Sequence, residues 1–239
     1  MMDLKESDIL GESINNHWYY NSKAKAVVAL LQELEVKSIL DVGAGSGFFS
    51  RYLLDNSSAE SAWCVDISYE QDSDEMHGCK PIHFRKAIDS LEVELVLLMD
   101  VLEHVDDDVK LLKYYVNRVP SGARFLISVP AFQFMWSGHD IFLEHRRRYR
   151  LKQIEHVVKE SGLSIITGVY YFGTIFPIAM FSRALGGIFS RKYSEPRSQL
   201  KQHSSIINFV LSAICNLEVP LMQFNRVAGL TAFCVAEKK

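Results

Sequence analysis

Short apolar runs alternate with amphipathic stretches along the chain, and this alternation predicts the main elements. Runs rich in β-branched and aliphatic residues, each closed by turn residues, are typical of buried strands. The stretches between them place apolar side chains at helical spacing, which is typical of helices that cover a sheet. Seven strands are predicted in this way, at Lys37–Ala44, Ser61–Ile67, Pro81–Ala87, Leu91–Met99, Arg124–Val129, Ser164–Phe172 and Thr231–Ala236.

Helical segments separate these strands at short spacing. The clearest are Phe48–Leu54, Asp106–Arg118 and Leu151–Glu160. Repeated alternation of strand and helix predicts an α/β fold: a Rossmann-like, doubly wound, mostly parallel seven-stranded sheet with helices on both faces. We expect residues 1–239 to form a single domain, with residues 13–34 as an N-terminal helical cap.

The last third of the chain has a different pattern. Leu163–Ser182 carries no charge over 20 residues, which is long enough for a membrane span, but two glycines and Pro177 interrupt it. We therefore expect a strand followed by a helical insert, residues 174–228, between strands six and seven. Three roles for this insert stay open: a cap, a dimer face in a homodimer, or an element that rests on a membrane surface.

Composition and charge narrow the class of protein. With 48% hydrophobic and 23% charged residues the chain is globular, and a net charge of −3 argues against a dedicated nucleic-acid binder. Residues 1–139 carry ten more acidic than basic side chains, whereas residues 140–239 carry seven more basic than acidic ones. The basic half predicts contact with something anionic, including peripheral contact with a membrane.

Cysteine spacing and the first residues bear on metal content and localisation. The four cysteines show no metal-ligand spacing, so no metal site is predicted. The start of the chain has no apolar run of the kind that a signal peptide needs, and we expect a cytoplasmic protein that can associate with a membrane.

A glycine-rich loop closes the first predicted strand. Gly43, Gly45 and Gly47 let the backbone approach a ligand, and Asp41 precedes them. The third glycine comes one place too early for a dinucleotide loop. The carboxylate of Asp41 would also repel a pyrophosphate, whereas it suits an α-ammonium group. Asp66, at the end of the second strand, is placed to bind ribose hydroxyls. A nucleotide-dependent oxidoreductase and a non-catalytic protein with this fold remain the alternatives.

Three segments resemble motifs of the class I S-adenosylmethionine-dependent methyltransferase family. They are Asp41–Gly47, Val65–Ser68 and Met99–Val105. The resemblance implies S-adenosyl-L-methionine as cofactor, with its methionine part near the glycine loop, its ribose at the second strand and its adenine after the third. The implied cofactor-binding residues are Asp41, Gly43, Ala44, Gly45, Gly47, Asp66, Ile67, Ala87, Ile88 and Asp100.

Two further features allow more than one interpretation. His104 can serve as a base, but a histidine in a strand-to-helix turn is more often a structural hydrogen-bonding group, which is the interpretation we favour. Trp18 and Tyr19 can close over a cofactor or pack against the core.

The densest polar run follows the fifth predicted strand. His139 and His145 are candidate bases with Asp140 as an orienting partner, because an oxygen or nitrogen nucleophile must lose a proton before or during methyl transfer. The alternative is a loop of polar residues that satisfy one another. Candidate substrate-binding residues in the run are Trp136, Arg147, Arg148 and Tyr149.

This run also resembles a bacterial subset of the family, which has a W-S-x-H-D pattern followed by H-x-R-R-Y. Trp136, Ser137, His139 and Asp140 match the first pattern, and residues 145–149 match the second. The subset is often associated with surface-polysaccharide and lipid-linked glycan genes. The resemblance therefore implies a small-molecule or lipid-linked acceptor.

Overall fold

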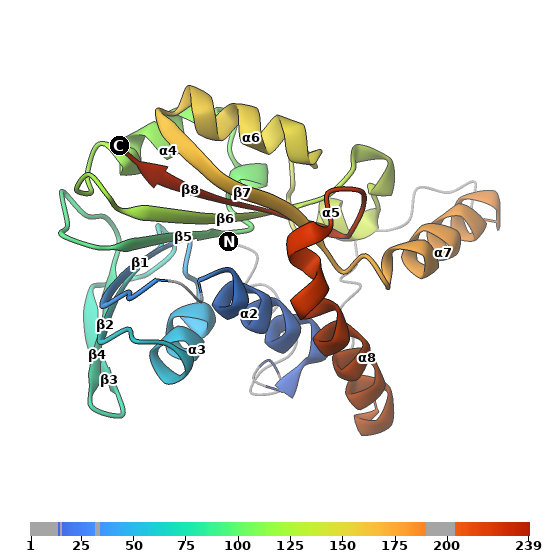
Figure 1. Cartoon of the computed structure of the whole chain (residues 1–239), viewed down its shortest axis with the longest axis horizontal. Helices are drawn as coiled ribbons and strands as arrows, with labels where there is room; N and C mark the ends of the chain where they lie inside the picture. Colours follow the sequence, from blue (N-terminus) through green and yellow to red (C-terminus); the bar gives the residue numbers. More distant parts are fainter. Residues whose placement is uncertain (1–13, 15, 32–33, 190–203) are drawn as a thin grey trace.

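The computed structural model describes residue 14 and residues 16–31, 34–189 and 204–239, with the backbone alone for 184–189. Its centre is one eight-stranded sheet in the order β3-β4-β2-β1-β5-β6-β8-β7 (Figure 1). The strands are β1 (Ser38–Val42), β2 (Ser61–Val65), β3 (Ser73–His77), β4 (Lys80–Arg85), β5 (Leu95–Met99), β6 (Arg124–Pro130), β7 (Leu163–Tyr171) and β8 (Thr231–Lys238).

Five neighbouring strands, β4-β2-β1-β5-β6, run parallel, and β8 pairs antiparallel with both β6 and β7. The predicted α/β class with a mostly parallel sheet is confirmed. The sheet has one strand more than predicted, because β3 forms an antiparallel hairpin with β4 around a left-handed Gly78. The sequence of β3 is polar and almost fully exposed, so it carries no apolar run to reveal it. Its Asp74 instead pairs with His83 and Arg85 across the hairpin.

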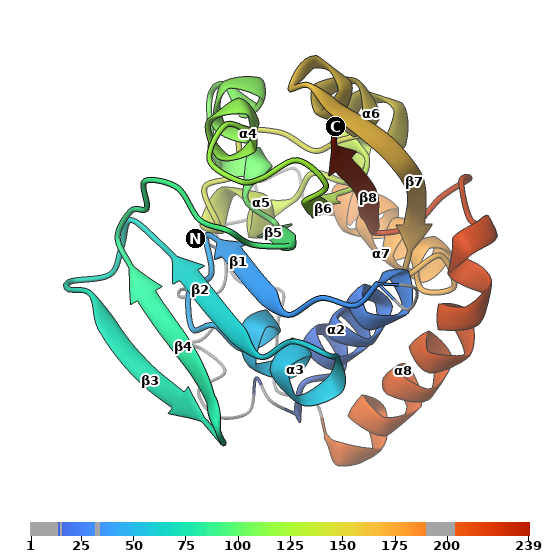
Figure 2. The same ribbon diagram turned by 60° about the vertical axis from the view of Figure 1, so that its left-hand side comes forward.

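Helices cover both faces of the sheet, as Figures 1 and 2 show. On one face, α2 lies between α3 and α8, and on the other, α4 packs beside α6. The helices are α2 (Trp18–Leu30), α3 (Phe48–Asn56), α4 (Asp108–Val116), α5 (Gly138–Phe142), α6 (Leu151–Glu160), α7 (Phe176–Phe189) and α8 (Ser205–Glu218). Short 3-10 turns are η2 (Leu102–His104), η3 (Gln133–Met135) and η4 (Val219–Phe224).

The sheet separates two apolar cores. Strand β5 is buried along its whole length, with Leu97 in the core under α2 and α3 and Leu98 in the core under α4 and α6. Covering a sheet on both faces favours apolar residues throughout, which is why this strand has a continuous apolar sequence. The carboxyl ends of the parallel strands meet at one edge, and the loops after β1, β2 and β5 lie there.

Between β7 and β8 the chain forms α7, α8 and η4. Helix α7 reaches away from the sheet, and α8 runs beside α2 (Figure 1). The junction is built around the carboxylate of Glu218, which accepts hydrogen bonds from the backbone N–H of Gly173 at 2.6 Å and of Thr174 at 3.1 Å. A buried acid thus ties the end of β7 to the end of α8.

Candidate functional site

The loop between β1 and α3 has a backbone that needs glycine. Gly43, Gly45 and Gly47 all have positive φ, and Gly47 is the N-cap of α3. A Cβ on Gly43 would lie 2.7 Å from Cγ2 of Val101, which is closer than side-chain atoms pack. The N–H of Gly43 also donates to the carbonyl of Val65 at 2.7 Å, so the loop is held against the end of β2.

Asp66 follows β2 and is buried beside this loop. Its carboxylate accepts hydrogen bonds from the N–H of Gly45 at 3.2 Å and from the N–H and hydroxyl of Ser68 at 2.9 and 2.5 Å. A carboxylate offers about four acceptor positions, so these contacts leave room for roughly one more donor. Asp66 is therefore positioned to accept a bond from one ligand hydroxyl rather than two.

A cavity of about 330 Å³, here called the loop cavity, opens beside these residues. Gly43, Asp66, Ile67, Val101 and His104 line it. Ala44, Gly45 and Gly47 belong to the same loop but are not among the residues of its wall.

Four other predicted cofactor residues lie outside the wall of the loop cavity: Asp41, Ala87, Ile88 and Asp100, the last of which lines a second cavity described below. Asp41 is buried behind the loop, where its carboxylate accepts a bond from the hydroxyl of Ser50 in α3 at 2.8 Å. Ile88 packs into the core under α4, and Ala87 is exposed. The position of Asp41 indicates that it holds the loop against α3.

A second cavity of about 330 Å³, the polar cavity, lies at the same edge of the sheet. It is assembled from segments far apart in the sequence: α2, the turn after β5, the end of β6, the segment around α5, and α7. Trp18 and Tyr19 of α2 form an aromatic wall, so both border a cavity as well as packing against Phe172 of the core.

Asp100 lies in the wall of the polar cavity and forms an ion pair with Lys23 of α2, which is completely buried. Asp100 has a left-handed backbone and accepts a further bond from the hydroxyl of Ser128 at 3.2 Å. Burial opposes the charge on Lys23, but the attraction of Asp100, together with smaller contributions from Tyr19 and Glu103, raises the pKa of Lys23 above its usual value. A lysine in an amphipathic helix normally points to solvent, so nothing in the sequence singles out Lys23.

Asp140 and His145 form a buried pair beside the cavity. Nδ1 of His145 lies 2.9 Å from Oδ1 of Asp140, and Arg148 donates to both oxygens of the same carboxylate at 2.6 and 3.0 Å. Burial disfavours the charge of Asp140, but bonds from His145 and Arg148 hold its pKa well below its usual range. His145 lines the polar cavity, and its Nε2 has no hydrogen-bond partner among the described residues.

His139 lines the same cavity but differs from His145 electrostatically. Burial, against an opposing effect of Asp140, lowers the pKa of His139 to about 4. Its imidazole is therefore neutral near pH 7 and a weak base. The structure thus separates the two predicted histidines, with His145 held by a carboxylate and His139 kept uncharged by its surroundings.

Of the four predicted substrate residues, only one lies in the wall of either cavity. Arg148 lines the polar cavity. Arg147 instead donates to the carbonyls of Val105 and Asp106, both at 2.8 Å, and the Tyr149 hydroxyl lies 2.7 Å from a carboxylate oxygen of Asp108. These contacts brace the loop after β5. Trp136 is half-buried and lines neither cavity.

Glu103 is a site residue that the sequence reasoning passed over. It is completely buried in the wall of the polar cavity, and neither side-chain oxygen has a hydrogen-bond partner among the described residues. Burial, reinforced by the nearby negative charge of Asp100, raises the pKa of Glu103 well above its usual value. Its neighbour His104 lines the other cavity, so these two residues stand between the two cavities.

Comparison with known proteins identifies the kind of fold. A family model described as a methyltransferase domain matches residues 16–167. No curated protein matches the chain.

Solved structures share the fold at low sequence identity. The O-methyltransferase family protein from Burkholderia thailandensis has a TM-score of 0.53 at 11% identity, over 95% of this chain and 59% of that one. Phosphoethanolamine N-methyltransferase 2 of Haemonchus contortus, in complex with S-adenosyl-L-methionine, has a TM-score of 0.52 at 16% identity. The match covers 90% of this chain and 52% of that one. The [4+2]-cyclase SpnF has a TM-score of 0.55 at 13% identity, and the match covers 92% of this chain and 81% of that one.

Proposed function

The chain belongs to the methyltransferase-domain family, and from this premise we propose that it moves the methyl group of S-adenosyl-L-methionine to an oxygen or nitrogen atom of an acceptor. S-adenosyl-L-methionine is the cofactor. The observation that carries the proposal is the pair of cavities at one edge of the sheet, one beside the glycine loop and one lined by buried polar groups. A methyl donor and an acceptor need two adjoining sites of this kind.

The loop cavity fits the cofactor. Gly43 brings backbone against the cavity with no side chain in the way, and Asp66 has capacity for about one ribose hydroxyl. When bound, the cofactor supplies an electrophilic methyl group on a sulfonium. Asp41 lies behind the loop and holds the loop in position by accepting a hydrogen bond from the hydroxyl of Ser50. Ala87 and Ile88 stay proposals for the adenine side, at the end of β4.

The polar cavity is the proposed acceptor site. Methyl transfer is an in-line displacement, so the chain must align the nucleophile and assist the loss of its proton. We assign this activating role to His145 with Asp140 as its orienting partner, because His145 presents Nε2 to the cavity. Arg148 and the neutral His139 help to position the acceptor, and Arg147 and Tyr149 support the surrounding loop.

The proposed acceptor is lipid-linked and glycan-like, and α8 supports this class. The polar side chains of α8 face the protein: Asn208 accepts a bond from the N–H of Trp18 at 2.8 Å, and Asn216 accepts one from Lys25 at 3.0 Å. Leu211 and Cys215 pack inward, but other apolar side chains of α8 face outward, including Phe209, which is 73% exposed. Other exposed apolar residues of α8 and η4 are Ile206, Leu217, Leu221 and Phe224.

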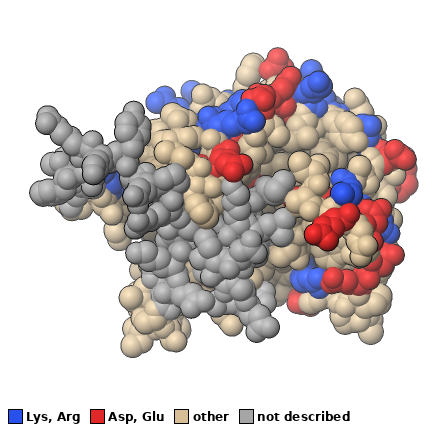
Figure 3. Space-filling model, turned by 180° about the vertical axis from the view of Figure 1, so that it is seen from behind, with Lys and Arg blue, Asp and Glu red and all other residues tan. Residues whose placement is uncertain are grey.

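This outward face favours a membrane surface over a span. Residues Ser205–Phe224 are long and apolar enough to cross a membrane, but their polar side chains bind α2 and the segment after β7 in the folded protein. Charged side chains gather on the edge of the molecule opposite α8 and along α4 and α6 (Figure 3). We therefore propose one domain at the cytoplasmic side of a membrane, with α8 in contact with lipid. The alternative is that the apolar face of α8 binds a second copy of the chain, in which case the protein is a homodimer.

Two measurements test the proposed function. The first is titration calorimetry of the full chain with S-adenosylhomocysteine and with NADH, in which only S-adenosylhomocysteine should bind. The second is incubation of cell extract with radiolabelled S-adenosylmethionine and the protein, followed by separation of lipid, small-molecule and polymer fractions. Label should enter the lipid fraction. Folded protein that fails to bind S-adenosylhomocysteine would exclude the proposal.

A histidine series tests the acceptor side. His145→Gln should lower turnover by about 100-fold, the size typical of lost proton-transfer assistance, while the affinity for S-adenosylhomocysteine stays within about twofold. His156→Gln is the matched control, since His156 is exposed on α6 and lines neither cavity. A loss of cofactor affinity in the His145 variant would show that this residue belongs to the cofactor site instead.

A further inference from the structure

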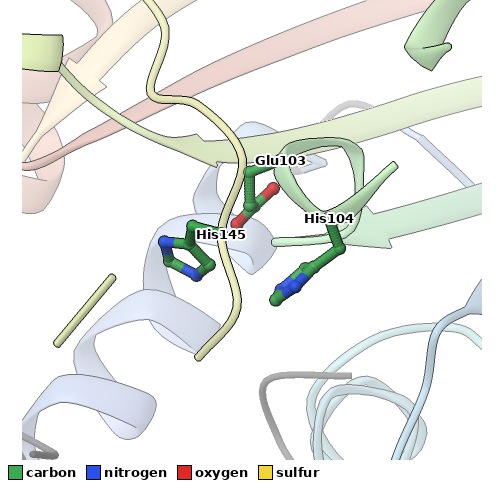
Figure 4. A group of neighbouring side chains, drawn as sticks. All are labelled: Glu103, His104 and His145. Atoms are coloured by element: carbon green, nitrogen blue, oxygen red, sulfur yellow. The ribbon is translucent and has the colours of Figure 1, made fainter. Parts of the chain in front are cut away.

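Glu103, His104 and His145 meet at the wall between the two cavities. One potential ligand atom from each, a carboxylate oxygen or an imidazole nitrogen, lies within 4.8 Å of the others. Figure 4 shows Glu103 and His104 on the turn η2 and His145 on a separate loop, with the three side chains directed toward one another. From this arrangement, we propose that the three side chains bind a divalent metal cation between the two cavities.

Glu103 carries the first part of the argument. Asp100, on the same wall, has Lys23 as its partner, and Asp140 has Arg148. Glu103 has the same degree of burial, but its two oxygens have neither a hydrogen bond nor an ion pair among the described residues. A buried carboxyl group without a partner costs free energy, whereas a cation bound to it would supply the missing interaction.

His145 carries the second part. A histidine that binds a metal through one ring nitrogen usually donates its other N–H to a carboxylate, which fixes the ring and raises its basicity. His145 has this arrangement: Nδ1 lies 2.9 Å from Oδ1 of Asp140, and Nε2 faces Glu103 and His104 with no hydrogen-bond partner among the described residues. Asp140 is fixed in turn by two bonds from Arg148 and one from the N–H of Ser137.

The ligand types define the class of cation. Two imidazoles and one carboxylate with open positions suit a first-row transition ion such as Mn²⁺, Fe²⁺, Co²⁺ or Zn²⁺ better than Ca²⁺, which prefers oxygen ligands. The expectation of no metal was based on cysteine spacing, and this cluster contains no cysteine. Residues 103 and 104 lie about forty positions from residue 145, so no sequence spacing reveals them as a set.

The role of the cation rests on the proposed function. Glu103 and His145 line the acceptor cavity, and His104 lines the cofactor cavity, so the cation would lie beside the path of the methyl group. A hydroxyl on the cation would lose its proton to water more readily. Its oxygen would then form the bond to the methyl carbon, while the sulfur–carbon bond breaks and its electron pair stays on sulfur. His145 would then assist this proton loss as a ligand of the cation, with Asp140 still as its orienting partner.

The test is metal binding by the full chain without any methyl acceptor. Protein stripped with a chelator is titrated with Co²⁺, read by its visible absorption, and equilibrated with Zn²⁺ or Mn²⁺ in dialysis. We expect one equivalent to bind. Glu103→Gln, His104→Gln and His145→Gln should each weaken it by at least about 10-fold, the lower end of what even outer-shell changes cost, while the exposed-surface control His156→Gln leaves it unchanged.

Two results would overturn the cation site. One is wild-type protein that binds no cation, and the other is binding that persists undiminished in Glu103→Gln and His145→Gln. Thermal unfolding shows that each variant is folded, because His104 lines the proposed cofactor cavity and His104→Gln can lower the affinity for S-adenosylhomocysteine directly. The S-adenosylhomocysteine affinity of wild type, Glu103→Gln and His145→Gln is measured as well. It also separates the two proposals, because a failure to bind S-adenosylhomocysteine excludes the proposed function, whereas a failure to bind cations in protein that still binds it excludes the cation site alone.

Discussion

The two cavities are built in different ways. One side of the loop cavity is formed by a short stretch of the chain, where Gly43 with its left-handed backbone, Asp66 and Ile67 lie together, and Val101 and His104 complete the wall. The polar cavity is formed by side chains that come from α2, η2, the segment around α5, and α7, and its charges are neutralised across long sequence distances, as between Lys23 and Asp100. The glycine-loop side of the loop cavity therefore depends on local conformation, whereas the polar cavity depends on tertiary pairing.

The largest effect is expected where tertiary pairing is broken. Lys23→Met should reduce the free energy of unfolding by about 3–5 kcal/mol, because it leaves Asp100 as a buried charge without its partner. Denaturant unfolding measures this change. Adding Asp100→Asn to the same chain should restore part of the stability, since the uncompensated charge is then gone. A loss of less than about 1 kcal/mol in the single variant would show that the pair contributes little.

The next effect tests the backbone of the loop cavity. Gly43→Ala should cost about 2–4 kcal/mol, from a left-handed backbone and from overpacking against Val101, and should weaken S-adenosylhomocysteine binding. Gly122→Ala is the matched control: it has φ of +87° but open space around its Cβ, so only the backbone cost applies. Equal losses of stability in the two variants would contradict the close approach to Val101. Thermal unfolding and calorimetry measure both quantities.

A smaller change tests the polar contact of the loop cavity. Asp66→Asn should weaken S-adenosylhomocysteine binding by about 10-fold, since an amide oxygen accepts less strongly than a carboxylate and the NH₂ group cannot accept at all. Glu75→Gln, in the exposed strand β3, is a charge-matched control and should leave the affinity unchanged. Unchanged binding in Asp66→Asn would place the ribose elsewhere.

The smallest effect on stability is expected at the outward apolar face of α8, which is proposed to contact lipid. Phe209→Ser with Leu217→Ser should change the free energy of unfolding by less than about 0.5 kcal/mol per site, because both side chains are exposed. Sedimentation with anionic vesicles should nevertheless fall strongly. Met76→Ser, exposed on β3, is the control and should sediment like wild type. If sedimentation is unaffected while the oligomeric state changes, α8 is a dimer face.

Much of the fold was predictable because burial leaves a signature in the sequence. Strand β5 is apolar on both faces because helices cover both, and the predicted run ends at Met99 as the strand does. Strand β3 has no such signature, since it forms an exposed edge held by pairing with β4. The same applies to Lys23, whose burial depends on Asp100 arriving from a different part of the chain.

The glycine loop and Asp66, on the side proposed for the cofactor, can be read from the sequence alone. Positive φ at three alternate glycines, and an aspartate at the end of the next strand, are properties of short contiguous segments, so local chemistry specifies them. The proposed acceptor side depends on tertiary structure. The tertiary structure placed Glu103 beside His145 and turned the apolar face of α8 outward. It also placed Arg147 and Tyr149 in hydrogen bonds to the loop after β5 and to Asp108, away from the cavity. The physical reason is that burial and charge pairing belong to groups that meet in space.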